Sequence, residues 1–271
     1  MDALRQRKGA SKIADIPPVV LEALNCGLIE TKTLVEWLAI HTEILATHVA
    51  QQLRMNTDEC TLFIQTARQV LDKGVTQRQK QMGQALAVIL QKNPALSIPL
   101  KQHPSDMVRS WHAYAVAHLH GHNLDVLLDE LQHFAADPSM STRECTWDAW
   151  RPYLARNIDK GIDLLMPWVV HEHDAIRRCA IEGTRPRGVW TCHLPELKLA
   201  PEKALPLLEK VKTDPSRYVQ NAVANWLNDA SKDHPVWVME VTSRWQQEND
   251  CTASRYIIKR SRRTIQKNSQ Q

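Results

Sequence analysis

The sequence has little glycine and lacks the motifs of several common enzyme classes. Only 8 of its 271 residues are glycine and 2 are phenylalanine, whereas leucine, alanine, glutamine and lysine abound. That mixture favours helix. No segment approaches the roughly 18 uninterrupted apolar residues of a membrane span, and no phosphate-binding loop, dinucleotide fingerprint or nucleophile elbow is present. The composition predicts an all-α protein, and these common site motifs do not indicate its function.

The six cysteines include no Cys-x-x-Cys pair. This pattern predicts free, mostly buried thiols in a reducing compartment. Because the N-terminus also lacks an apolar signal core, we expect a soluble cytoplasmic protein with access to the chromosome. His118, His120 and His122 alternate like metal ligands, but residues i, i+2 and i+4 cannot share one helical face. We therefore expect no metal and no organic cofactor.

Positive charge is small in total but concentrated in places. The net charge is +4, which alone indicates little about partners. Basic residues gather near residue 180 and again in the last expected helix. Nothing in the sequence points to a membrane or to an obligate protein partner.

Three regions follow from the pattern along the chain. Residues 1–15 are polar and basic and are expected to form a loose arm, which contacts phosphate or is simply solvated. Residues 16–100 carry amphipathic helix patterns. Residues 101–271 carry an internal repeat.

The repeat is a seven-residue block that opens a helix. Its copies are HPSDMVR at 103–109, DPSMSTR at 137–143, HEHDAIR at 171–177 and DPSRYVQ at 214–220. The last residues of successive copies lie 34, 34 and 43 positions apart, a period typical of stacked helix pairs. The opening is HEAT-like, so the predicted fold is an α-α superhelix of HEAT-like repeats.

The last position of the block suggests a partner. Stacked helices would align their N-terminal ends, which carry unpaired N–H groups and partial positive charge. Arg109, Arg143 and Arg177 would then line a groove that attracts an anion. Alternatively, each arginine bridges to an aspartate or carbonyl of the neighbouring repeat.

Two longer blocks resemble a known family. They are RRCAIEGTRPRGVW at 177–190 and VANWLNDASKDHP at 223–235, and RYIIKRSRRTI at 255–265 follows them. These blocks resemble the AlkC branch of the DNA alkylation repair family of HEAT-like proteins. The resemblance implies a glycosylase that excises cationic alkylated bases from double-stranded DNA, namely 3-methyladenine, 7-methylguanine or 3-methylcytosine. Lesion preference and oligomeric state do not follow from it.

The resemblance implies three site residues and shows one departure. Glu182, Trp190 and Asp229 match the family's acidic, aromatic and acidic positions. A further acidic position falls on Trp147 here, with Asp148 one residue late, which is about 100° around a helix. Trp147 is expected as a second aromatic wall, and whether the change abolishes catalysis stays open.

The residue types suit the chemistry. A cationic base leaves without protonation, so carboxylates need only stabilise the sugar and orient water, while tryptophan faces attract the cation. The alternatives are that Glu182 is an internal ion-pair member, that Asp229 ends or caps a helix, and that Trp190 packs between repeats.

Basic side chains would hold the DNA phosphates. The candidates are Arg109, Arg143, Arg151, Arg177, Arg178, Arg185, Arg187, Lys232, Lys259, Arg260, Arg262 and Arg263. Two other functions compatible with the sequence are a DNA-structure-binding protein without catalysis and a protein-binding scaffold.

Overall fold

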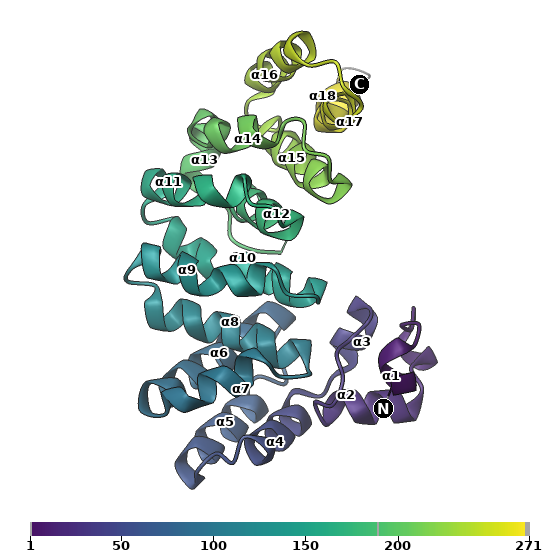
Figure 1. The fold of residues 1–271 in the computed structure, drawn as a ribbon, viewed down its shortest axis with the longest axis vertical. Helices are drawn as coiled ribbons and strands as arrows, with labels where there is room; N and C mark the ends of the chain where they lie inside the picture. The colour runs from purple at the N-terminus through teal and green to yellow at the C-terminus, as the bar shows by residue number, and fades with distance from the viewer. Residues whose placement is uncertain (1, 189, 269–271) are drawn as a thin grey trace. The chain divides into compact units, whose positions relative to one another are not determined.

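The computed structural model describes residues 2–188 and 190–268, and all regular secondary structure in those ranges is helical (Figure 1). The chain divides into two compact units, residues 1–149 and residues 150–271. The division falls within a helix, α10, whereas the repeat signal begins near residue 101. None of the described helices is both long and apolar enough to cross a membrane.

The first unit holds eleven helical elements and most of α10. They are α1 (Asp2–Gln6), η1 (Ile13–Asp15), α2 (Pro18–Asn25), α3 (Leu34–Ala39), α4 (Thr42–Gln52), α5 (Thr57–Gln69), α6 (Val75–Lys92), η2 (Pro94–Leu96), α7 (Ser97–Lys101), α8 (Asp106–His120), α9 (Leu124–Ala135) and α10 (Met140–Leu154). Helix α8 is central and packs on α6, α7 and α9. Gly83 permits the close approach of α6, because a Cβ atom there would lie 2.3 Å from the Cβ of Tyr114.

The N-terminal segment contacts the rest of this unit. Arg7 donates to the carboxylate of Glu36 at 2.6 Å and to the carbonyl oxygen of Glu30 at 3.1 Å. Glu36 is 1% exposed and also accepts the backbone N–H of Ala10 at 3.2 Å. The expected loose arm therefore includes two short helices and an anchored arginine.

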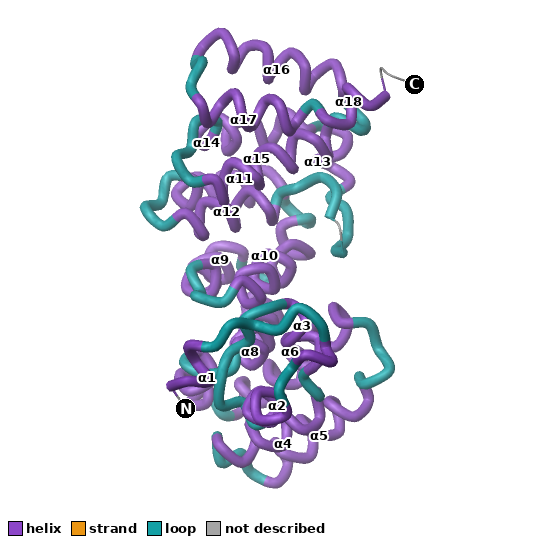
Figure 2. The backbone as a smooth tube through the Cα atoms, turned by 90° about the vertical axis from the view of Figure 1, so that its right-hand side faces the viewer, coloured by secondary structure: helices purple, strands orange, loops and turns teal. Residues whose placement is uncertain are grey.

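The second unit consists of two rows of helices (Figures 1 and 2). Its elements after α10 are α11 (Ile158–Val169), α12 (Asp174–Gly183), α13 (Pro195–Leu199), η3 (Pro201–Ala204), α14 (Leu205–Val211), α15 (Arg217–Ala230), α16 (Pro235–Glu248), α17 (Thr252–Ser261) and α18 (Arg263–Asn268). Helices α12, α15 and α17 pack in sequence to form one row, while α11, α14 and α16 lie beside them. The candidate carboxylates both lie in the row of α12, α15 and α17.

Tryptophan serves mainly as packing in both units. Trp111, Trp150, Trp226 and Trp245 are fully buried, and Trp111 meets Phe63 edge-on at 5.7 Å between ring centroids. Cysteine differs in part from expectation: the six cysteines form no disulfide, but only Cys145 and Cys179 are buried, whereas Cys192 and Cys251 are exposed.

Candidate functional site

The seven-residue block forms the same turn in all four copies. The side chain at position one accepts the backbone N–H of position three, which directly precedes the helix that follows. These four bonds are Ser105 to His103 (3.1 Å), Ser139 to Asp137 (2.8 Å), His173 to His171 (3.0 Å) and Ser216 to Asp214 (2.8 Å). Position seven then donates to the carbonyl of position one, as Gln220 does to Asp214 at 2.7 Å.

Two position-seven arginines also join one repeat to the next. Arg109 forms a fork with Asp137 at 2.7 and 2.9 Å, and Arg177 forms the same fork with Asp214 at 2.7 and 3.0 Å. Arg143 donates to the carbonyl oxygen of Asp137, position one of its own block, at 2.5 Å, as the other position-seven residues do in theirs. Arg109 is only 7% exposed. The alternative of inter-repeat bridging therefore describes Arg109 and Arg177, whose guanidinium forks are occupied by carboxylates.

Arg151 supports the loop after α12 by hydrogen bonds to its backbone. This side chain is fully buried and donates to the carbonyl oxygens of Gly183 (2.9 Å), Arg185 (2.5 Å) and Cys192 (2.9 Å). A Cβ atom at Gly183 would lie 2.1 Å from the ring of Trp150, so only glycine fits there. Arg151 was expected to contact DNA, but its burial makes it a positioning residue for this loop.

The same loop presents Trp190 and Arg187. It is closed by a backbone bond from the N–H of Leu194 to the carbonyl of Pro186 at 3.0 Å. Trp190 is 42% exposed. Arg187 pairs with Asp233 at 2.7 Å, and this bond together with the charge of Arg187 lowers the pKa of the Asp233 carboxyl.

Glu182 and Asp229 are brought together by one guanidinium. Arg185 donates to Glu182 at 2.9 Å and to Asp229 at 2.7 and 2.9 Å. Glu182 is the penultimate residue of α12 and Asp229 that of α15, two helices that pack directly. The two carboxylates are 2% and 4% exposed. The matched acidic positions thus form one cluster, which we call the acid pair.

The acid pair is surrounded by more positive than negative charge. Arg178 lies 3.3 Å from Glu182, and Lys232 lies 2.9 Å from Asp229 with a side chain that is 40% exposed. Burial alone would lower the pKa of the Arg185 guanidinium, but Glu182 and Asp229 outweigh it and raise that pKa. Three cations therefore face two anions, and Arg185 stays protonated. The sequence-based alternative of an internal ion pair holds for this conformation.

Trp147 and Asp148 are both buried in the first unit. Asp148 is fully buried and accepts the hydroxyl of Tyr114 at 2.7 Å, with Lys80 3.2 Å away. Trp147 is 4% exposed, and its indole N–H donates to Glu144 at 3.2 Å. Neither side chain lies open to solvent, which differs from the aromatic wall expected for Trp147.

The C-terminal basic residues do not share one direction. Arg262 donates to Thr242 (2.8 Å) and Ser243 on α16, whereas Arg263 donates to Asn225 on α15 at 3.0 Å. Lys259 and Arg260 are exposed. Two aromatic contacts were missed by the sequence analysis, because they join residues far apart: Arg217 covers the ring of Tyr256, and Arg178 covers that of Tyr218.

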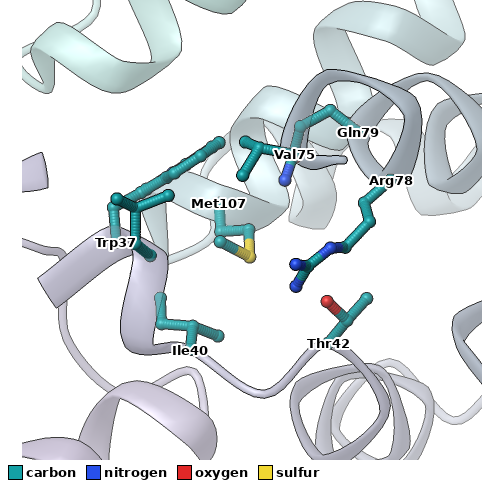
Figure 3. A pocket seen from close by; sticks show the side chains of 8 residues that line it. Trp37, Ile40, Thr42, Val75, Arg78, Gln79 and Met107 are labelled. Carbon is teal, nitrogen blue, oxygen red and sulfur yellow. The ribbon is translucent and has the colours of Figure 1, made fainter. Parts of the chain in front are cut away.

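A separate, small cavity lies in the first unit (Figure 3). Trp37, Arg78, Gln79 and Met107 are among its lining residues, and the indole N–H of Trp37 and Oε1 of Gln79 are buried without a protein partner. Within residues 2–188 and 190–268, no group of three histidine, cysteine or acidic side chains is placed to hold a metal ion.

Known proteins of DNA alkylation repair are similar to this chain in sequence and in fold. Residues 143–260 match the family model described as DNA alkylation repair enzyme. The uncharacterized protein YhaZ of Bacillus subtilis (strain 168) is 42% identical over 119 residues, which are 44% of this chain and 33% of YhaZ. The chain thus covers a third of that relative's length.

Solved structures extend the likeness beyond the matched block. The Pseudomonas fluorescens alkylpurine DNA glycosylase AlkC, bound to DNA containing an abasic site analog, is 26% identical with a TM-score of 0.67. That match covers 80% of this chain and 61% of AlkC. AlkD2 from Streptococcus mutans, at 21% identity, 74% and 97% coverage and a TM-score of 0.57, shows the fold alone. The resemblance predicted from the motifs, and the all-α repeat fold, are confirmed.

Proposed function

We propose that this chain is a DNA glycosylase that removes cationic alkylated bases, with the acid pair Glu182 and Asp229 at its centre. The observation that carries the proposal is the convergence of these two carboxylates, from separate helices, on Arg185. Both carboxylates occupy positions that the resemblance to the family implies are acidic site residues. The likeness to AlkC, a glycosylase solved on DNA, supports the same assignment.

Removal of a cationic base needs few other groups from the protein. A base alkylated at a ring nitrogen carries positive charge and is already a good leaving group, so no general acid is needed. As the glycosidic bond lengthens, positive charge develops on the sugar, and a carboxylate nearby stabilises it and orients the attacking water. The exposed indole of Trp190 offers a face for the departing cation, worth about 0.5–2 kcal/mol.

The cations around the acid pair give DNA a role in exposing it. In the free protein the pair is neutralised by Arg178, Arg185 and Lys232. A phosphate competes for the same guanidinium and ammonium groups through charge-assisted hydrogen bonds. Each cation that turns to a phosphate of the DNA backbone leaves the two carboxylates with more uncompensated negative charge. The cationic base of the damaged nucleotide then takes the place of that cation beside the carboxylates. This role on DNA places the protein where the chromosome is accessible.

The test is release of free base from methylated duplex DNA under enzyme excess. Wild type is compared with Glu182→Gln and Asp229→Asn, each of which removes charge at nearly constant volume. We expect each variant to slow release by about 100-fold or more, because an electrostatic contact to a developing charge is typically worth that much. Glu196→Gln, an exposed carboxylate paired with Lys203, is the matched control. Equal rates in all four proteins would contradict the proposal.

A second candidate is DNA binding without base removal. It is favoured by the placement of Trp147 and Asp148, since the matched acidic position holds an indole and the neighbouring carboxylate is buried against Tyr114 and Lys80. Salt-sensitive binding to duplex or abasic DNA with no base released by wild type would select this candidate.

A further inference from the structure

Tyrosine rings hold several arginines along the row α12, α15 and α17. The guanidinium carbon of Arg217, on α15, lies 3.5 Å from the ring centroid of Tyr256 on α17, and that of Arg260 lies 5.5 Å from it. The hydroxyl of Tyr256 donates to Asn221 at 2.7 Å, which fixes the ring. We call Arg217, Tyr256 and Arg260 the Tyr256 clamp.

Arg217 and Arg260 differ from Arg177 and Arg185 in how their charge is used. Arg177 and Arg185 place their forks on carboxylates, which neutralise them. A tyrosine ring holds a guanidinium by cation–π attraction and leaves its net charge and its outward N–H groups available. Arg217 and Arg260 are exposed. In the described part of the chain, neither has a carboxylate within ion-pair distance.

The surroundings of the clamp add to its positive potential. Lys259 and Arg263 are exposed beside it on α17 and α18. Arg217 is also the first residue of the 14-residue helix α15, whose N-terminal end carries partial positive charge. Because the ring already orders the two guanidinium groups, less conformational entropy is lost when they bind an anion.

We propose that the Tyr256 clamp binds the phosphate backbone of the DNA on which this protein acts. The inference rests on the proposed role on DNA but concerns a different set of residues from the acid pair. It assigns backbone contact to Arg217 and Arg260, while Arg109 and Arg177 join repeats. Arg217 and Tyr256 belong to neither of the matched central blocks.

The test measures binding of an unmodified duplex as a function of salt. The double variant Arg217→Ala/Arg260→Ala is compared with Arg244→Ala/Lys210→Ala, which removes the same charge from α14 and α16, where Arg244 pairs with Glu209 and Glu248. The slope of log K against log salt is negative, and each lost phosphate contact reduces its magnitude by about 0.9. We expect the slope of the clamp variant to be smaller in magnitude by about two, and we expect this variant to bind DNA at least about fivefold more weakly than the control. A slope and affinity equal to those of the control would overturn the proposal.

Tyr256 supplies a test at constant charge. Tyr256→Phe loses the hydroxyl bond to Asn221 but keeps the ring under both guanidinium groups, and it is expected to bind nearly as tightly as wild type. Tyr256→Leu removes the ring that orders both guanidinium groups and is expected to bind more weakly than Tyr256→Phe. Thermal unfolding by circular dichroism verifies that each variant is folded. Equal affinity of the Phe and Leu variants, both folded, would refute the role of the ring.

Base release separates this inference from the proposed function. If the clamp variants lose affinity and wild type releases no base, the clamp stands and the glycosylase proposal fails. If wild type releases base and the clamp variants bind as the control does, the clamp fails and the glycosylase proposal stands.

Discussion

Replacing Arg151 tests how the candidate site is held. Its guanidinium donates to three carbonyl oxygens of the loop between Gly183 and Cys192, and it is fully buried. Hydrogen bonds from a charged group contribute about 1.5–3 kcal/mol each, and a buried acceptor left unpaired costs about 1–3 kcal/mol. Arg151→Lys keeps the charge but offers a single point of attachment. We expect it to lower the free energy of unfolding by about 3 kcal/mol, within the range of large single-site effects.

The assay pairs urea unfolding with hydrogen exchange. Because the loop loses its support, exchange should accelerate in residues 184–188 and 190–192 more than in α16, which Arg151 does not support. Arg156→Lys is the control, since Arg156 is exposed and lies over the ring of Tyr153 at 5.2 Å. A loss below about 1 kcal/mol, or unchanged exchange in the loop, would refute this account of Arg151.

Two further predictions concern stability. Arg109→Ala leaves the carboxylate of Asp137, whose side chain is 2% exposed, without its ion-pair partner, and should lower the free energy of unfolding in urea by about 3–5 kcal/mol. The control is Arg68→Ala, because the side chain of Arg68 is 63% exposed where it pairs with Glu43, and this variant should lose less than about 1 kcal/mol. Similar losses in the two variants would contradict the importance of the fork between Arg109 and Asp137. Burial first, and Arg109 second, lower the pKa of His103 to about 4, whereas an unfolded histidine titrates near about 6.5. Unfolding therefore takes up a proton between these values, and the free energy of unfolding falls as pH drops from about 6.5 to about 4, by about 2 kcal/mol at pH 5. His103→Asn, which can still accept the N–H of Ser105, should remove this contribution, so an unchanged pH profile between pH 7 and 5 would show that His103 is not its source.

The repeat block shows what the sequence could predict. A block that continues from position one with Pro or a polar residue and has Arg or Gln at position seven predicts a helix start, and the structure has the same turn in all four copies. The sequence could not decide between a groove and an inter-repeat bridge for Arg109. That depends on where Asp137 lies in space, 28 residues later, and the fork settles it.

Burial and long-range pairing account for what the sequence missed. Arg151 is a basic residue of the kind that contacts DNA phosphates, so the sequence predicts that role for it. Only the structure shows that it is buried against the loop after α12. The stacking of Arg217 on Tyr256 joins positions 39 apart, so no local pattern reports it. The motif predicts both members of the acid pair, but it identifies Arg185 only as one more basic residue and not as the partner that they share.

The central claim is that two ion-paired carboxylates become the catalytic groups of a base-releasing enzyme. Its most direct measurement is chromatography of free bases after wild-type protein, in excess, meets duplex DNA carrying 3-methyladenine and 7-methylguanine. The account predicts free alkylated base and a matching number of abasic sites, with normal bases untouched. Binding of that DNA at saturation without release of any base would contradict it.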